Sequence, residues 1–332
     1  MTINSFFLYP KSPFHFDGTF HKPSHFPNKL PLDDWQPGKY WQLMRVGEKL
    51  FGLRIEDRGD VYNPKLKVTA YFNFDNLRDD RLKDGKTKLP QSELELIKKE
   101  IIYRYELDQD LSDFIKLTKK NKRFTPVFNR WLGMRNSCEH NLYELLIISI
   151  VLQNATVHRS VQMLDNLLVK YGDQTEFDHK KFYAIWRPEN LKYVSEQKLR
   201  NLKIGYRAKF IKRLTEDFID KKVDEFSLRK MTKESARNEL MKLYGVGPET
   251  SRILLFEALH HYDAFDHIAP WQQKIYSQLF YNQPLVSANK IKKDIIKHYG
   301  RYSMLAVHYI WEDIFWRRKN EKIDWLEKEI RL

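Results

Sequence analysis

The chain has 332 residues, of which 42% are hydrophobic and 14% aromatic. This length and composition exclude a disordered protein and are sufficient for two or three domains with a substantial core. The 58 basic residues outnumber the 44 acidic ones, and the formal net charge of +14 favours a polyanionic partner because Lys and Arg neutralise phosphates. The single cysteine, Cys138, excludes a disulfide framework, a cysteine-ligated zinc site and an iron–sulfur cluster.

Residues 1–105 are predicted to form a small β-rich domain. Alternating or β-rich runs at 40–46, 50–55 and 66–72 are separated by turn-forming residues, which is typical of an antiparallel sheet. Residues 94–105 have helical periodicity and are predicted to pack on that sheet.

The pattern becomes helical from about residue 108 and stays helical almost to the end, including a short predicted helix over 179–184. The expected fold class is therefore α+β, mostly α, with a small antiparallel β domain followed by a helical domain over 106–332. The N-terminal residues lack the apolar core of a signal peptide, and the longest apolar run, 145–152, is too short to cross a bilayer. We expect a protein inside the cell and not secreted, in the cytoplasm or nucleoid of a prokaryote or the nucleus of a eukaryote, with no membrane partner.

Residues 234–259 are predicted to form two helices joined by a tight hairpin. The turn reads Leu243-Tyr244-Gly245-Val246-Gly247-Pro248-Glu249-Thr250. Glycine permits positive φ and close backbone approach, and proline is favourable at the first position of a helix. The second helix then presents free N–H groups and its positive dipole end at the turn, where a phosphate can bind without any side chain. The alternative is an ordinary glycine-capped hairpin in a helical core.

The order of the motifs resembles that of the helix-hairpin-helix DNA glycosylase superfamily, and more closely its branch of alkylpurine and 8-oxoguanine glycosylases. The similarity covers most of the chain, with matching pieces at residues 105–108, 123–126, 152–159, 204–209 and 243–250, followed by Asp266. It implies a monomeric enzyme that flips a damaged nucleotide from double-stranded DNA and cleaves its N-glycosidic bond. It implies no metal or redox cofactor, although relatives often hold a phosphate through a monovalent cation at the hairpin.

Asp266 matches the catalytic aspartate of this superfamily. Cleavage of a nucleoside bond passes through an oxocarbenium-like sugar, which a carboxylate stabilises while it activates water. Asp266 lies 17 residues after Glu249, at the short end of the family's spacing, and Asp263 fits that spacing less well. The alternative for Asp266 is a helix-capping or turn residue.

Glu249 occupies the position at which bifunctional relatives carry the lysine that attacks the sugar and forms a Schiff base. A carboxylate cannot perform this reaction, so the resemblance implies a monofunctional glycosylase that leaves an intact abasic site. The alternative for Glu249 is a first-turn glutamate favoured by the helix dipole. The phosphate-binding candidates around it are Gly245, Val246, Gly247 and Thr250.

Four residues match positions that contact the gap left by the flipped base and its estranged partner: Asn154, Arg159, Tyr206 and Arg207. Planar side chains can stack in such a gap, and arginine donates in fork geometry to base edges. The alternatives are a helix-end cap for Asn154 and a solvated helix face for Arg159.

Trp311 matches an aromatic residue that stacks on the extruded base, and Trp271 and Ile253 complete the predicted base pocket. The alternative for Trp311 is a place in the helical core. Val307 stands where an 8-oxoguanine reader presents an amide, and it favours recognition by stacking. Cationic alkylated purines suit an aromatic pocket. The leading hypothesis is therefore an alkylpurine glycosylase, with an oxidised-purine (8-oxoguanine-type) glycosylase and a non-catalytic damaged-DNA-binding protein as alternatives.

Overall fold

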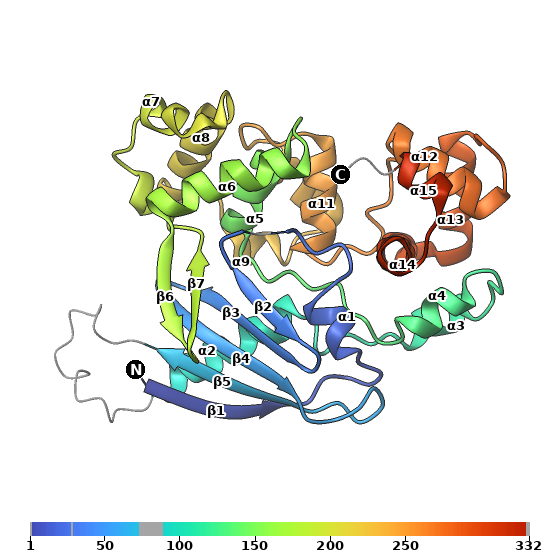
Figure 1. Cartoon of the computed structure of the whole chain (residues 1–332), viewed down its shortest axis with the longest axis horizontal. Helices are drawn as coiled ribbons and strands as arrows, with labels where there is room; N and C mark the ends of the chain where they lie inside the picture. The colour runs from blue at the N-terminus through green and yellow to red at the C-terminus, as the bar shows by residue number, and fades with distance from the viewer. Residues whose placement is uncertain (1, 28, 73–88, 330–332) are drawn as a thin grey trace.

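The computed structural model describes residues 2–27, 29–72 and 89–329, so part of each predicted domain lies outside the description. Its N-terminal part is an antiparallel sheet with the strand order β1-β5-β4-β3-β2 (Figure 1). The strands are β1 (Thr2–Leu8), β2 (Asp33–Gln36), β3 (Lys39–Val46), β4 (Lys49–Asp57) and β5 (Leu66–Phe72). The three strands predicted from the sequence are confirmed as β3, β4 and β5, whereas β1 and β2 were not predicted.

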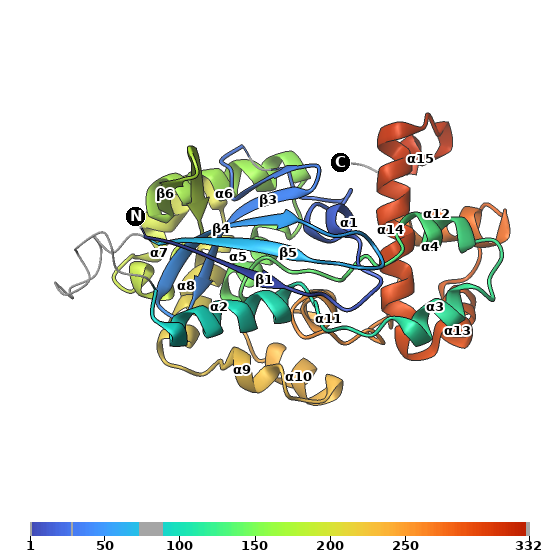
Figure 2. The same ribbon diagram turned by 90° about the horizontal axis from the view of Figure 1, so that it is seen from below.

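Helix α2 (Gln91–Arg104) runs across one face of this sheet, as Figure 2 shows, and confirms the helix predicted over 94–105. Ile97 and Ile101 are buried in one apolar cluster with β3, β4 and β5 and with the short helix α1 (Phe16–Phe20). Burying this helix face stabilises the sheet, because each fully buried aliphatic side chain contributes about 1.5–3 kcal/mol.

A two-stranded hairpin, β6 (Asp173–Phe177) and β7 (Lys180–Ala184), packs on the face of the sheet opposite α2. The helix predicted over 179–184 is therefore wrong. Phe182 and Ala184 are buried while Lys181 is exposed, which is the period-two alternation of a strand. The turn residue Asp178 fixes the hairpin, because its carboxylate accepts hydrogen bonds from Trp41, Tyr71 and Arg54 at 2.7–2.9 Å.

The rest of the chain is helical, which confirms the α+β, mostly α fold class. The helices are α3 (Ser112–Thr118), α4 (Thr125–Arg130), α5 (Leu142–Leu152), α6 (Val157–Tyr171), α7 (Glu196–Leu199), α8 (Arg207–Ile219), α9 (Glu225–Leu228), α10 (Lys233–Leu240), α11 (Pro248–Glu257), α12 (Pro270–Tyr276), α13 (Ala288–Tyr299), α14 (Ser303–Asn320) and α15 (Asp324–Glu329). Short 3-10 or π turns lie at η3 (Pro188–Leu191), η4 (Arg200–Ile204), η5 (Ser277–Tyr281) and η6 (Gly300–Tyr302). No described helix is long and apolar enough to span a membrane.

Helix α5 forms the centre of the helical part and is buried on nearly every side. It begins at a capping box, in which Asn141 and Glu144 satisfy each other's backbone N–H groups. Figure 1 shows α6, α8 and α11 gathered around it, with α3, α4 and α12–α15 forming a second group of helices. Helix α11 and the segment before α5 thus lie next to the N-terminal part, and the candidate site forms there.

Candidate functional site

The hairpin between α10 and α11 is shaped by two glycines with different roles. Gly245 has φ +92°, and a Cβ there would lie 2.7 Å from the ring of Phe210 on α8. Gly247 is the N-cap of α11, with Pro248 in the first position and no side chain capping the helix. A Cβ on Gly247 would meet no atom within 4 Å, so the turn is open in front of the free N–H groups. This geometry suits an anion at the helix start.

Two of the residues predicted to contact the gap left by the flipped base lie beside this hairpin. The Gln153 amide donates to the Gly245 carbonyl oxygen at 2.8 Å, which ties the end of α5 to the turn. Next to it Asn154 has φ +48°, and its amide nitrogen lies 3.3 Å from the Tyr206 hydroxyl oxygen. Tyr206 is 41% exposed. The structure therefore brings Asn154 and Tyr206 together on the surface, at the mouth of the hairpin.

The two predicted arginines differ in their placement. Arg159 is exposed on α6 and donates to the Lys203 carbonyl oxygen. Arg207 is only 7% exposed, and its guanidinium donates to the carbonyl oxygens of Ile150 and Gln153. The Arg207 donors are thus engaged by carbonyl oxygens at the end of α5 in the free chain, and its contact with the estranged base stays a prediction.

Asp266 lies in the segment between α11 and α12. The buried side chains of Phe265 and Ile268 anchor this segment on either side, so the Asp266 carboxylate points outward and is 43% exposed. It forms an ion pair with Arg237 of α10. Ala269 is the N-cap of α12, so Asp266 does not cap that helix. Asp263 pairs separately with Lys233 at 2.7 Å.

Glu249 lies in the first turn of α11 and pairs with Arg252, whose Nε is 3.2 Å from the second carboxylate oxygen. Arg252 is buried, and its other nitrogen donates to the Met304 sulfur of α14 at 3.4 Å. The Glu249 charge is thus compensated within the chain, consistent with a first-turn glutamate whose position is fixed by packing.

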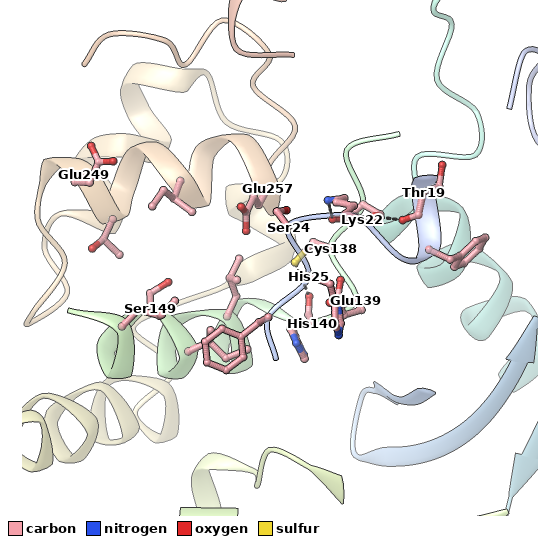
Figure 3. A pocket seen from close by; sticks show the side chains of 18 of the residues that line it. Thr19, Lys22, Ser24, His25, Cys138, Glu139, His140, Ser149, Glu249 and Glu257 are labelled. Atoms are coloured by element: carbon pink, nitrogen blue, oxygen red, sulfur yellow. Dashed lines mark hydrogen bonds between the residues drawn. The ribbon is translucent and has the colours of Figure 1, made fainter. Parts of the chain in front are cut away.

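A cavity of about 450 Å³ lies between α11, α5 and the segments around residues 19–26 and 137–140 (Figure 3). This volume is in the range of small-ligand sites. Helix α11 contributes Glu249, Thr250, Ile253 and Glu257 to its lining. Thr250, predicted to contact phosphate, therefore faces the cavity, as does Ile253 of the predicted base pocket.

Polar groups gather at the inner end of this cavity. Lys22 donates to the Ser137 carbonyl oxygen at 2.6 Å. Burial raises the pKa of Glu257, and the nearby charge of Lys22 opposes this effect. Behind the cavity lining, the buried carboxylate of Glu312 accepts hydrogen bonds from the backbone and hydroxyl of Ser24 at 2.9 and 2.6 Å. The cavity thus combines an apolar wall with carboxylates and one ammonium group.

The two predicted pocket tryptophans lie together but outside the lining of this cavity. Their ring centroids are 5.3 Å apart. Trp311 is buried and donates to the Tyr276 hydroxyl, as expected for a core residue, while Trp271 is 44% exposed. Of the three residues of the predicted base pocket, only Ile253 lines this cavity.

No protein-family model matches the chain. A probable N-glycosylase/DNA lyase of Methanothermobacter thermautotrophicus is 25% identical over 203 residues, which cover 55% of this chain and 64% of that protein. The chain spans between 41% and 64% of the length of the curated relatives it matches.

Two solved structures resemble the chain over nearly its whole length. The 3-methyladenine DNA-glycosylase of Archaeoglobus fulgidus has a TM-score of 0.73 at 16% identity, covering 96% of this chain and 99% of that one. An 8-oxoguanine glycosylase/lyase of Clostridium acetobutylicum has a TM-score of 0.66 at 18% identity, covering 94% and 98%. The chain has the fold of a helix-hairpin-helix DNA glycosylase. The resemblance stated from the sequence is confirmed at this level.

Most of the residues that line the cavity could not be predicted from the sequence. Lys22, Glu139 and Glu257 belong to segments that lie far apart in the chain. One local signal was present: Glu249, Ile253 and Glu257 recur every four residues, so they share one face of α11. The partners of that face could be found only from the tertiary structure.

The close contact between the hairpin turn and Phe210 leads to a stability prediction. We expect Gly245→Ala to lower the free energy of unfolding by roughly 2–4 kcal/mol, because it combines positive φ with a clash against Phe210. Gly247→Ala is the matched control and should cost less than about 1 kcal/mol, since its site is open. Urea unfolding measures both values. Equal losses of unfolding free energy in the two variants would contradict the proposed close approach. The loss caused by Gly245→Ala should also be smaller when it is measured in a Phe210→Ala background.

Proposed function

We propose that the chain is a monofunctional DNA glycosylase that removes a damaged, alkylated purine from double-stranded DNA and leaves an abasic site. The proposal is supported chiefly by the pairing of an open hairpin turn at Gly247 with the outward carboxylate of Asp266, which Arg237 ties to the same hairpin. A phosphate held on the start of α11 places one DNA strand beside that carboxylate.

Asp266 performs the chemistry in this proposal. The N-glycosidic bond breaks and its electron pair leaves with the base, while the carboxylate stabilises the positive charge that develops on the sugar. A water activated by Asp266 then adds to the sugar and releases a proton. An ion pair as exposed as Asp266–Arg237 is worth about 0–1 kcal/mol, so DNA phosphates can draw Arg237 away at little cost.

The surface next to the hairpin supplies the groups needed to extrude a nucleotide. Asn154 and Tyr206 are exposed and mutually hydrogen-bonded, and they fill the gap that the flipped base leaves. Arg159, on the adjacent helix α6, contacts the DNA strand opposite the flipped nucleotide. Extrusion costs a few kcal/mol in lost stacking and pairing, which stacking on an aromatic ring of this kind offsets.

The alkylated-purine preference is supported by the charges at the cavity. Three carboxylates line it, those of Glu139, Glu249 and Glu257. Glu249 is neutralised by Arg252, and Glu257 faces the positive charge of Lys22. The three carboxylates outnumber these two basic side chains, so a cationic base gains electrostatic stabilisation there that a neutral base does not. The glycosidic bond of a cationic base is also already weakened. In this proposal the damaged base lies against the acidic cavity wall and does not stack on Trp311.

An oxidised-purine glycosylase is the second candidate, supported by the Asn154, Arg159 and Tyr206 surface and by the 8-oxoguanine glycosylase/lyase among the fold neighbours. A non-catalytic damaged-DNA-binding protein is the third. Incubation with duplexes carrying 3-methyladenine, 7-methylguanine, hypoxanthine or 8-oxoguanine separates the three. Tight lesion binding without base release under single-turnover conditions would favour the third.

A monovalent cation at the hairpin, the absence of a catalytic metal, and a monomeric state stay predictions.

Asp266→Asn tests the assigned carboxylate. The variant keeps the side-chain shape but loses the charge, so we expect single-turnover base release to fall by at least about a hundredfold while duplex affinity changes little. Asp263→Asn is the control and should retain activity. Full activity of Asp266→Asn would remove this mechanism.

The product distinguishes a glycosylase from a lyase. With Glu249 in place of lysine, the wild-type protein should form no borohydride-trapped covalent complex with DNA, and product strands should break only after alkali treatment. Denaturing gels with and without alkali measure this. Nicking without alkali, or a trapped complex, would mean that another amine attacks the sugar.

Glu257→Gln tests the acidic cavity. We expect a roughly ten- to hundredfold loss of 7-methylguanine release and little change for neutral hypoxanthine, because a hydrogen bond to a charged group is worth about 1.5–3 kcal/mol. Burial raises the pKa of Glu257, so its ionised form, and with it this preference, should increase as the pH rises through that raised pKa. Glu239→Gln on α10 is the control. Equal losses for both lesions would contradict a charge-based preference.

A further inference from the structure

We propose that His25, Asp33 and Glu139 form a binding site for a divalent metal ion, with Zn²⁺ as the preferred occupant. One ligand atom from each residue can be chosen so that all three lie within 4.8 Å of one another. Figure 3 shows His25 and Glu139 side by side at the cavity wall. One imidazole nitrogen and two carboxylate oxygens form a donor set that suits zinc.

The three residues come from separate segments. His25 lies in the loop after α1, Asp33 begins β2, and Glu139 lies in the segment before α5. A metal ion at this position would join the N-terminal sheet to the start of the central helix. Such a bond between distant segments restricts the unfolded chain and stabilises the fold in proportion to metal affinity.

The two oxygens of the Asp33 carboxylate have different neighbours. Its side chain is 8% exposed, one oxygen lies 3.2 Å from His25 Nε2, and the other accepts a hydrogen bond from the Tyr40 hydroxyl at 3.1 Å. A hydrogen bond to the outer oxygen of a ligating carboxylate is the usual support for a metal ligand. Zinc–ligand bonds of about 2.0–2.2 Å place ligand atoms roughly 3–4 Å apart, so only a small movement of Glu139 completes the site.

Glu139 is the observation that points to a cation. Its side chain is half-buried and makes no hydrogen bond or ion pair with any residue that the structure describes. A half-buried carboxylate beside an Asp–His pair leaves a net negative charge that a metal ion would neutralise.

The site borders the cavity and shares Glu139 with the carboxylates that line it, so a bound metal ion would lower the negative charge there. His25 and Glu139 both line the cavity, so the metal positions not taken by protein atoms face that space and are filled by water. The inference therefore goes beyond the glycosylase proposal, and it does not depend on it. A plain His25–Asp33 ion pair is the competing explanation, and it gives Glu139 no role.

The test uses the metal-free full-length chain. Co²⁺ is titrated while its visible absorption is recorded, Zn²⁺ then competes for the site, and thermal unfolding is measured with and without Zn²⁺. We expect one Co²⁺ per chain in a protein-ligated environment, displacement by Zn²⁺, and a raised unfolding temperature with Zn²⁺.

Glu139→Gln is the deciding variant, because this side chain has no described partner and its replacement should leave the fold intact. It should weaken Zn²⁺ binding by at least about tenfold and reduce the thermal shift, and His25→Gln should do the same. His158→Gln and Glu234→Gln, on exposed surfaces of α6 and α10, are matched controls that should bind Zn²⁺ as the wild-type chain does. Absence of stoichiometric binding, or equal binding by the wild-type chain and Glu139→Gln, would overturn the proposal.

Discussion

The backbone of the hairpin turn passes so close to the Phe210 ring that a side chain cannot be accommodated at Gly245 without displacement. This contact sets α10 and α11 against α8, and the hydrogen bond from Gln153 sets the same turn against the end of α5. Through α10, Arg237 holds Asp266, and through α11, Glu249 and Glu257 reach the cavity. The proposed phosphate anchor, the proposed catalytic carboxylate and the cavity therefore all depend on the position of this one turn.

Most charged groups around this turn are already paired in the free chain. Asp266 pairs with Arg237, Glu249 with Arg252, and Arg207 caps carbonyls of α5. The first pair is partly exposed and contributes only about 0–1 kcal/mol, whereas Arg207 is buried and its removal would delete two hydrogen bonds to the end of α5. In the proposed function, DNA can therefore displace Arg237 from Asp266 while the contacts of Arg207 keep the end of α5 in place.

Local chemistry explains which parts were predictable from the sequence. Glycine and proline at 245–248 determine a hairpin through backbone sterics, and alternating runs mark β3, β4 and β5. The short strand β7 was read as a helix because its alternation is brief and its burial depends on contacts with Trp41 and Tyr71 from another part of the chain. The cavity and the burial of Arg207 and Trp311 likewise arise from long-range packing, which leaves no periodic signal in the sequence.

In the proposed function, the damaged base binds in the cavity between α11 and α5, and not against the tryptophan pair formed by Trp271 and Trp311. A crystal structure of the Asp266→Asn variant bound to a duplex carrying an alkylated purine tests this most directly. The account predicts a phosphate on the N–H groups that follow Gly247, Tyr206 or Asn154 in the vacated gap, and the extruded base beside Ile253 and Glu257. A base bound elsewhere, or a duplex bound away from the hairpin, would contradict it.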